Sequence, residues 1–169
     1  MVMSISLLPC FQADALTQIT PEFLSRKQIK LLMMDFDNTI VPYTTDIPTA
    51  EMKQWLEQMK ESGIQLCVVS NSKKDRVKVF CKAYGLDCIT HSRKPFPKGI
   101  RCCMEKYGIP AAHCGLVGDQ IFTDTLGANA CGVCSILIKA IHNHTVWLKL
   151  RHVAELPFIF LARKRRVDL

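Results

Sequence analysis

Short apolar runs alternate with more polar stretches along this chain, and the alternation predicts its secondary structure. Runs of four to eight apolar residues bounded by turn residues are typical of strands buried in a parallel sheet. The stretches between them predict helices, because the capping-type residues Thr49 and Thr123 stand near two starts and Gly63 and Gly108 follow two ends. We expect strands at residues 29–36, 64–69, 87–90, 114–118 and 134–138, and helices near 49–62, 73–84, 98–107 and 123–130.

The order strand, helix, strand repeats along the chain, which favours an α/β fold with a doubly wound parallel sheet. The length of 169 residues and the hydrophobic content of 49% fit one globular domain, which we place at residues 1–169. The apolar runs are too short to span a bilayer, and the first ten residues lack the basic leader of a secretory signal. We therefore expect a cytoplasmic protein.

The cysteines agree with a reducing compartment. There are nine, an odd number at irregular spacings, which argues against a disulfide framework. Cys131 and Cys134 have the spacing of a redox or zinc half-site, but no second pair stands at a suitable distance. Buried thiols are the simpler interpretation.

Two carboxylates, Asp35 and Asp37, stand directly after the first predicted strand, in the pentapeptide DFDNT. Where a strand gives way to a loop, both side chains can reach one site, so one could attack phosphorus while the other moves a proton. The alternative is a strand that simply ends in a polar turn, which Asp, Asn and Thr often form. The pair alone leaves both interpretations open.

Three further polar clusters follow other predicted strands. The hydroxyl and amides of Ser70-Asn71-Ser72 could hold a phosphoryl oxygen, and Lys94 or Lys98 could supply a compact positive charge. Asp119 and Asp124 add carboxylates, which Mg²⁺ prefers as ligands. Ligands of an open parallel sheet gather outside the carboxyl ends of its strands, where all four clusters would lie. Their joint order predicts a site for phosphate transfer.

These motifs, in this order, resemble those of the haloacid dehalogenase superfamily. More narrowly, the chain resembles the YqeG group of subclass IIIA phosphatases over nearly its whole length. The resemblance rests on these stretches: Leu8-Pro9, Ile19-Thr20-Pro21, Asp35 to Thr39, Val68-Val69-Ser70-Asn71, Arg93-Lys94-Pro95, Gly118-Asp119-Gln120 and Thr123-Asp124.

The resemblance implies a role for each motif. Asp35 would be the nucleophile that forms an aspartyl phosphate. Asp37 would be the general acid and base, which protonates the leaving oxygen and later activates water. Ser70 would bind the phosphoryl group with help from the Asn71 backbone.

The resemblance also implies Mg²⁺ as the cofactor. Its ligands would be Asp35, the backbone carbonyl of Asp37, and Asp119, with Asp124 in this set or directly beside it. The essential lysine matches Lys94 better, by the pattern Arg-Lys-Pro, and Lys98 is the alternative.

Members of this superfamily usually select substrates with an inserted cap. Residues 39–49 and 88–94 leave no room for one here, so we expect a capless enzyme with an open catalytic mouth. An open mouth can accept a phosphate on a bulky molecule such as a lipid headgroup, whereas small soluble substrates usually need enclosure to exclude water.

Charge narrows the choice among bulky substrates. The net charge is +7, and most of the excess lies after residue 138. The segment at about 145–169 mixes aromatic and aliphatic residues with cations, and such a stretch can lie at the surface of an anionic membrane, where each basic residue gains roughly 1 kcal/mol. Alternatively, this segment packs its apolar face on the sheet while its basic end is solvated.

Our leading hypothesis is a Mg²⁺-dependent phosphomonoesterase that converts phosphatidylglycerophosphate to phosphatidylglycerol, a substrate that the resemblance implies. Its partner would be a phosphorylated lipid headgroup, with peripheral contact to the inner face of an anionic membrane and no obligate nucleic acid. One alternative is a phosphatase of a soluble sugar or nucleotide phosphate. Another is a noncatalytic RNA- or ribosome-binding module, which the positive charge suggests but which would leave four intact motifs unexplained.

Overall fold

A six-stranded parallel sheet forms the centre of the protein. The computed structural model describes residues 6–73, 75–141 and 156–161. The strands lie in the order β1-β6-β5-β2-β3-β4, and every neighbouring pair is parallel. Their bounds are β1 Phe11–Ala13, β2 Leu31–Met34, β3 Gln65–Val69, β4 Asp87–Ile89, β5 Cys114–Gly118 and β6 Cys134–Ile138. The predicted doubly wound sheet is confirmed, and its five predicted strands are present. Strands β5 and β6 have the predicted bounds, and β2, β3 and β4 are slightly shorter than predicted.

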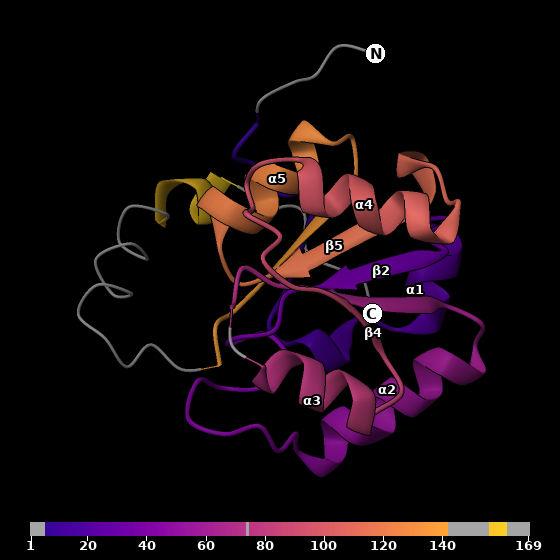
Figure 1. Cartoon of the computed structure of the whole chain (residues 1–169). Coiled ribbons are helices and arrows are strands. Elements are labelled where there is room, and N and C mark those ends of the chain that lie inside the picture. The colour runs from indigo at the N-terminus through magenta and orange to yellow at the C-terminus, as the bar shows by residue number, and fades with distance from the viewer. Residues whose placement is uncertain (1–5, 74, 142–155, 162–169) are drawn as a thin grey trace.

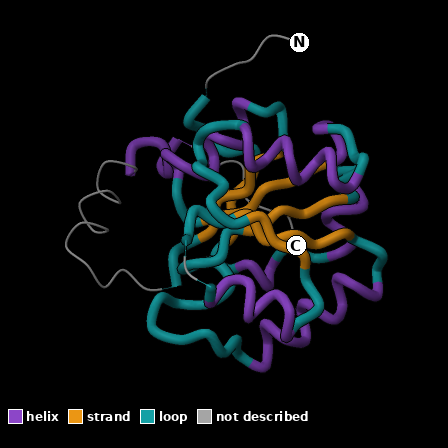
Figure 2. The backbone as a smooth tube through the Cα atoms, in the orientation of Figure 1, coloured by secondary structure: helices purple, strands orange, loops and turns teal. Residues whose placement is uncertain are grey.

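Helices cover both faces of this sheet (Figures 1 and 2). Helices α4 and α5 lie on one face, while α2 and α3 lie on the other, where α1 joins the same hydrophobic cluster. The helices are α1 Pro21–Arg26, α2 Ala50–Glu61, α3 Arg76–Ala83, α4 Lys98–Tyr107 and α5 Leu126–Ala130. The shorter turns are η1 Leu16–Gln18, η2 Ala111–His113 and the π-helical η3 Ile121–Thr125.

Strand β2 lies between β5 and β3 in the middle of the sheet. Successive side chains of a strand point to opposite faces, and helices cover both faces of this sheet, so both sets of β2 side chains are buried. Leu32 and Met34 join the cluster under α2 and α3, whereas Leu31 and Met33 join the cluster under α4. All four side chains are fully buried. This double burial explains the continuous apolar run that predicts the strand, and it places the following residue, Asp35, at the end of the most protected strand.

The chain switches direction across the sheet beside β2. From β2 it builds β3 and β4 on one side, then crosses to build β5 and β6 on the other. Between β2 and β5 the order therefore reverses, and ligands of open α/β sheets bind at such a point. The arrowheads of β2 and β5 in Figure 1 point to the same edge of the sheet.

The predicted helix limits are only partly right. Thr49 caps α2, since its hydroxyl oxygen accepts a 3.1 Å bond from the Met52 amide, and Gly108 ends α4 with φ +64°. The predicted cap at Thr123 is wrong. That residue lies inside the π-helical turn η3, and its hydroxyl donates to Oε1 of Gln120, the residue that precedes the turn.

The sequence patterns missed two elements near the N-terminus, β1 and α1. The edge strand β1 has three residues, so it offers too few positions for a pattern to appear. Helix α1 has six residues but does begin with a readable signal, because Thr20 caps the Phe23 amide at 3.2 Å and Pro21 occupies the first turn.

Most of the predicted amphipathic segment 145–169 lies outside the described residues. Its part at 156–161 is helical and contacts the body of the protein. The Phe158 ring packs edge-on to Phe122 at 6.4 Å, and the Gln12 side chain donates a 3.1 Å bond to the Ile159 carbonyl. Phe160 and Leu161 remain exposed. Within the part of the chain that the structure describes, no helix combines the length and apolar character needed to cross a membrane.

Candidate active site

The parallel sheet gathers the predicted motifs at the carboxyl ends of its strands. Asp35 follows β2 directly and extends its pairing, because its amide donates a 2.9 Å bond to the Val117 carbonyl of β5. Ser70 follows β3 in the same way and donates its amide to Ile89 of β4 at 2.9 Å. The side chains of Asp35 and Ser70 are buried, as are those of Lys94, Asp119 and Asp124.

Lys94 lies at the centre of the site. Its Nζ is 2.7 Å from Oδ1 of Asp35 and 2.7 Å from Oδ1 of Asp124, so one ammonium joins two carboxylates from different loops. Burial opposes the charged ammonium, but Asp124 and Asp35 outweigh burial and hold the pKa of Lys94 above its ordinary value. Lys94 therefore stays protonated at neutral pH.

Asp35, Asp119 and Asp124 form a buried triad. One oxygen from each carboxylate lies within 4.8 Å of the other two. Burial raises the pKa of Asp124 to about 6, although Lys94 opposes the rise and Asp35 adds to it. The one ammonium of Lys94 offsets only one of three negative charges, and oxygen donors are the ligands that Mg²⁺ prefers. The donor set therefore fits this ion.

Gly118 allows the triad to close. A Cβ atom at this position would overlap the Asp124 carboxylate. Asp124 also accepts the Gln120 amide at 3.1 Å through Oδ2, which ties the carboxylate to the turn after β5. The glycine of the Gly118-Asp119 motif is thus needed for the approach of Asp124 to the strand end.

Asn71 holds the loop that carries Lys94. Its Oδ1 accepts the Lys94 amide at 2.7 Å and the Ser92 hydroxyl at 2.8 Å, while its Nδ2 donates to the Lys94 carbonyl at 2.9 Å. The sequence predicts a role in phosphate binding for the Asn71 backbone only, and this use of the Asn71 side chain was not predicted.

The structure separates the two candidate lysines. Lys94 is 4% exposed and contacts the carboxylates, whereas Lys98 is exposed at the first residue of α4. Ser70 is linked to the loop that carries Lys94, because its carbonyl accepts the Ser92 amide at 3.0 Å. Its hydroxyl oxygen accepts the Ser72 amide at 3.0 Å. A hydroxyl in this arrangement can still donate its proton to a phosphoryl oxygen.

Arg76 is a functional candidate that was not predicted from the sequence. Its Nη1 lies 3.1 Å from Oδ1 of Asp37, and both side chains are mostly buried. One signal was available, because Arg76 is the first residue of α3 and a cation there opposes the helix dipole. Such a placement suggests a tertiary partner.

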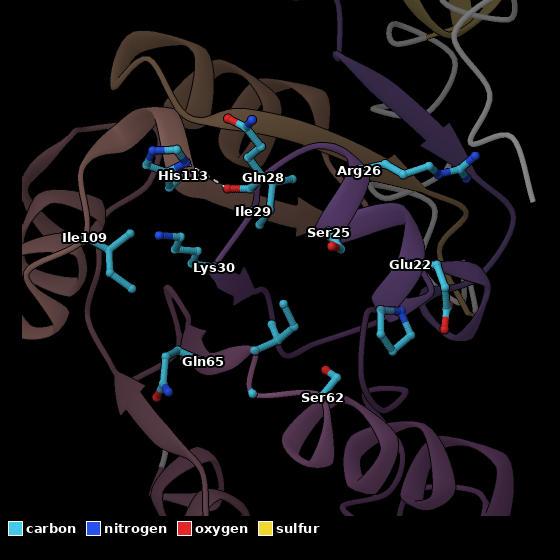
Figure 3. A pocket seen from close by; sticks show the side chains of 13 residues that line it. Glu22, Ser25, Arg26, Gln28, Ile29, Lys30, Ser62, Gln65, Ile109 and His113 are labelled. Carbon is cyan, nitrogen blue, oxygen red and sulfur yellow. Dashed lines mark hydrogen bonds between the residues drawn. The ribbon is translucent and has the colours of Figure 1, made fainter.

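A separate cavity of about 1110 Å³ lies at the other edge of the sheet (Figure 3). Lys30 and Gln65 line it at the amino ends of β2 and β3, and His113 accompanies them, with its Nδ1 2.9 Å from the Gln28 carbonyl. The carboxylates of the triad do not contribute to it. The candidate active site and this cavity therefore lie at opposite ends of the strands. A capless site on an open sheet edge need not form a deep cavity.

The geometry is the one expected of a class of protein, a hydrolase of phosphate esters that combines strand-end aspartates, a buried lysine and a carboxylate triad able to hold a metal ion. The chain belongs to the haloacid dehalogenase-like hydrolases, since the model of that family matches residues 17–132. It is a phosphoric monoester hydrolase of this family. Over 120 residues it is 37% identical to the probable phosphatase YqeG of Bacillus subtilis (strain 168), covering 71% of this chain and 70% of that protein.

Solved structures share the fold at low sequence identity. An uncharacterized protein from Listeria monocytogenes serotype 4b aligns with a TM-score of 0.56 and 18% identity, over 78% of this chain and 99% of that one. The cobalt-bound form of the deoxy-D-mannose-octulosonate 8-phosphate phosphatase YrbI from Haemophilus influenzae aligns with a TM-score of 0.54 and 14% identity, over 85% and 93% of the two chains. These likenesses show that the α/β fold is shared.

Proposed function

We propose that this phosphatase removes the terminal phosphate of phosphatidylglycerophosphate through an aspartyl-phosphate intermediate. The observation that carries the mechanism is the position of Lys94 between Asp35 and Asp124, beside Asp119. A cation that is held between carboxylates at a strand end can neutralise both the nucleophile and the phosphoryl oxygens that approach it.

Each residue of the site has a defined task in this proposal. Asp35 attacks phosphorus, and Lys94 orients its carboxylate. Asp37 protonates the leaving glycerol oxygen and then accepts a proton from the water that hydrolyses the aspartyl phosphate. Ser70 and the Asn71 backbone bind the equatorial oxygens of the phosphoryl group.

Mg²⁺ would be held by Asp35, Asp119 and the backbone carbonyl of Asp37, with Asp124 closing the set. It would supply Lewis-acid neutralisation of the transferred phosphoryl group. Lys98 is exposed near the mouth and would at most contact a substrate outside the catalytic cluster.

The surroundings of the site support a lipid substrate. Ile47 is 71% exposed and Phe96 is 68% exposed, and they belong to loops that follow β2 and β4 at the catalytic edge. The cations Lys73, Arg93 and Lys98 are exposed in loops or helix starts of the same edge. Apolar side chains among cations are typical of surfaces that touch anionic bilayers. Peripheral contact with the inner face of such a membrane is part of the proposal.

The test is phosphate release from phosphatidylglycerophosphate in mixed micelles, with and without Mg²⁺, beside soluble glycerol 3-phosphate. Asp35→Asn should abolish release, whereas Glu57→Gln, which removes an exposed carboxylate from α2, should leave it unchanged. Release from the soluble ester alone would keep the mechanism and reject the lipid substrate. Salt-dependent RNA binding that survives Asp35→Asn, without hydrolysis of either ester, would support a binding module instead.

A further inference from the structure

We infer that Arg76 is the positioning residue for the Asp37 carboxylate and connects it to the loop at 42–46. The inference rests on the proposed role of Asp37 in proton transfer to the leaving oxygen. Nη1 of Arg76 lies 3.1 Å from Oδ1 of Asp37, and Nε lies 2.5 Å from Oδ1 of Asp46. One guanidinium therefore joins the carboxylate beside the nucleophile to a carboxylate of the next loop.

The same guanidinium also binds the backbone of this loop. Nη2 donates to the Thr45 carbonyl at 3.0 Å and to the Pro42 carbonyl at 3.4 Å, and Nη1 donates to the Tyr43 carbonyl at 3.3 Å. Its Cζ lies 5.2 Å from the centre of the Phe36 ring. The contacts use the several donors and the flat face of an arginine, which a lysine cannot reproduce.

These contacts restrict the position of the Asp37 carboxylate, which proton transfer to the leaving oxygen requires. Asp37 leaves the strand end in a tight turn, in which the Asn38 amide donates to the Val41 carbonyl at 2.8 Å. The side chain of Asp37 is 16% exposed, so it reaches the open mouth while Arg76 binds Oδ1. In the proposed mechanism, the other oxygen of the carboxyl group serves the leaving group. General acid catalysis depends on such placement within hydrogen-bond reach.

Arg76 does not belong to the cluster around Lys94. It comes from α3, contacts Asp37 rather than the metal-binding triad, and acts through another residue. A structural role alone would weaken the protein without regard to the leaving group. A positioning role would weaken only those reactions in which the leaving oxygen needs a proton.

The experiment compares two substrates by kcat/KM, which reports the step that forms the aspartyl phosphate. p-Nitrophenyl phosphate has a leaving group that needs little protonation, whereas glycerol 3-phosphate and phosphatidylglycerophosphate release an alkoxide that needs a proton. The comparison uses p-nitrophenyl phosphate and whichever of the two alkyl esters the unaltered protein hydrolyses faster. Asp37→Asn should lower kcat/KM for that alkyl ester about 100-fold more than for p-nitrophenyl phosphate. Arg76→Gln should lower kcat/KM for the alkyl ester about tenfold more than for p-nitrophenyl phosphate, and in Arg76→Lys this difference should be smaller.

Lys78→Gln is the matched control, because it removes an exposed cation from the same helix and should affect both substrates equally or not at all. Melting temperatures identify variants that do not fold. If Arg76→Gln does not fold, the test is made with Arg76→Lys. If the Arg76 variants lose kcat/KM equally on both substrates while Asp37→Asn loses it selectively, the positioning role of Arg76 is overturned and the proposed role of Asp37 is kept. No selective loss in Asp37→Asn would overturn the proposed role of Asp37 and the inference with it.

Discussion

The ammonium of Lys94 lies 2.7 Å from Oδ1 of Asp35, and both side chains are buried at the end of the central strand. The pair does not stand alone, because Asp124 takes a second contact from the same ammonium. A buried ion pair contributes little net stability compared with apolar residues, but removal of one partner leaves the other charge uncompensated. A catalytic role therefore explains this arrangement better than a contribution to stability does.

Replacement of Lys94 should test this role. We expect Lys94→Met to lower kcat by about 10²- to 10³-fold, as loss of a single charge-stabilising donor does elsewhere. The metal-free variant should also lose about 3–5 kcal/mol of unfolding free energy, because Asp35 and Asp124 face each other without a cation. Phosphate release and urea unfolding would measure both effects. The control is Lys98→Gln, which should stay within about 0.5 kcal/mol of the original protein; the same loss in both variants would contradict our choice of Lys94.

Magnesium should stabilise the fold through the triad. Three carboxylates share a site with one ammonium, so a divalent cation removes repulsion that the folded protein otherwise carries. At one hundred times the dissociation constant, Mg²⁺ should add about 2.7 kcal/mol to the unfolding free energy, which is a rise of about 5–10 °C in Tm for a chain of this size. Differential scanning fluorimetry with EDTA and with Mg²⁺ would measure it. Asp119→Asn should remove most of the rise, and an undiminished rise would place the ion elsewhere.

The acidity of Asp124 makes this effect depend on pH. Its pKa is raised from 3.8 to about 6, chiefly by burial. In the metal-free protein the folded state holds a proton that the unfolded state has lost, so the contribution of Asp124 to stability is present below about pH 4 and is lost as pH rises through 6. Mg²⁺ needs the ionised carboxylate, so its affinity should increase over the same interval.

Melting curves at pH 5.0 and 7.5 would test this linkage. We expect the stabilisation by a fixed Mg²⁺ concentration to be larger at pH 7.5, and Asp124→Asn to remove most of the difference between the two pH values. The same stabilisation at both pH values in the unaltered protein would show that Asp124 is ionised throughout and that its environment is more polar than the structure indicates.

The sequence patterns predicted the sheet because its central strands are buried on both faces. Double burial produces unbroken apolar runs, as in β2 and β5, and such runs are visible without any alignment. The three-residue strand β1 is different, since only its register against β6, with Phe11 beside Ile136, defines it. A pairing between segments more than a hundred residues apart leaves no local pattern.

The same distinction applies to the site. The gathering of Asp35, Asp119 and Asp124 could be predicted, because parallel strands bring their carboxyl ends to one edge. The contacts of Arg76 and of the Asn71 side chain could not, because each depends on the course of a loop. Loop geometry is set by tertiary contacts, which residue types and spacing do not encode locally.

Asn71 offers the sharpest separation between a backbone role and a side-chain role. Its side chain makes three hydrogen bonds to the loop that carries Lys94, at 2.7, 2.8 and 2.9 Å. Asn71→Ala keeps the backbone amide for the phosphoryl group but removes these bonds, so Lys94 should lose its fixed position over Asp35. We expect a fall of about tenfold or more in kcat, and a loss of about 1–3 kcal/mol in unfolding free energy because buried partners lose their bonds. Activity equal to that of the unaltered protein would mean that only the Asn71 backbone serves the reaction and that the Lys94 loop is held by other contacts.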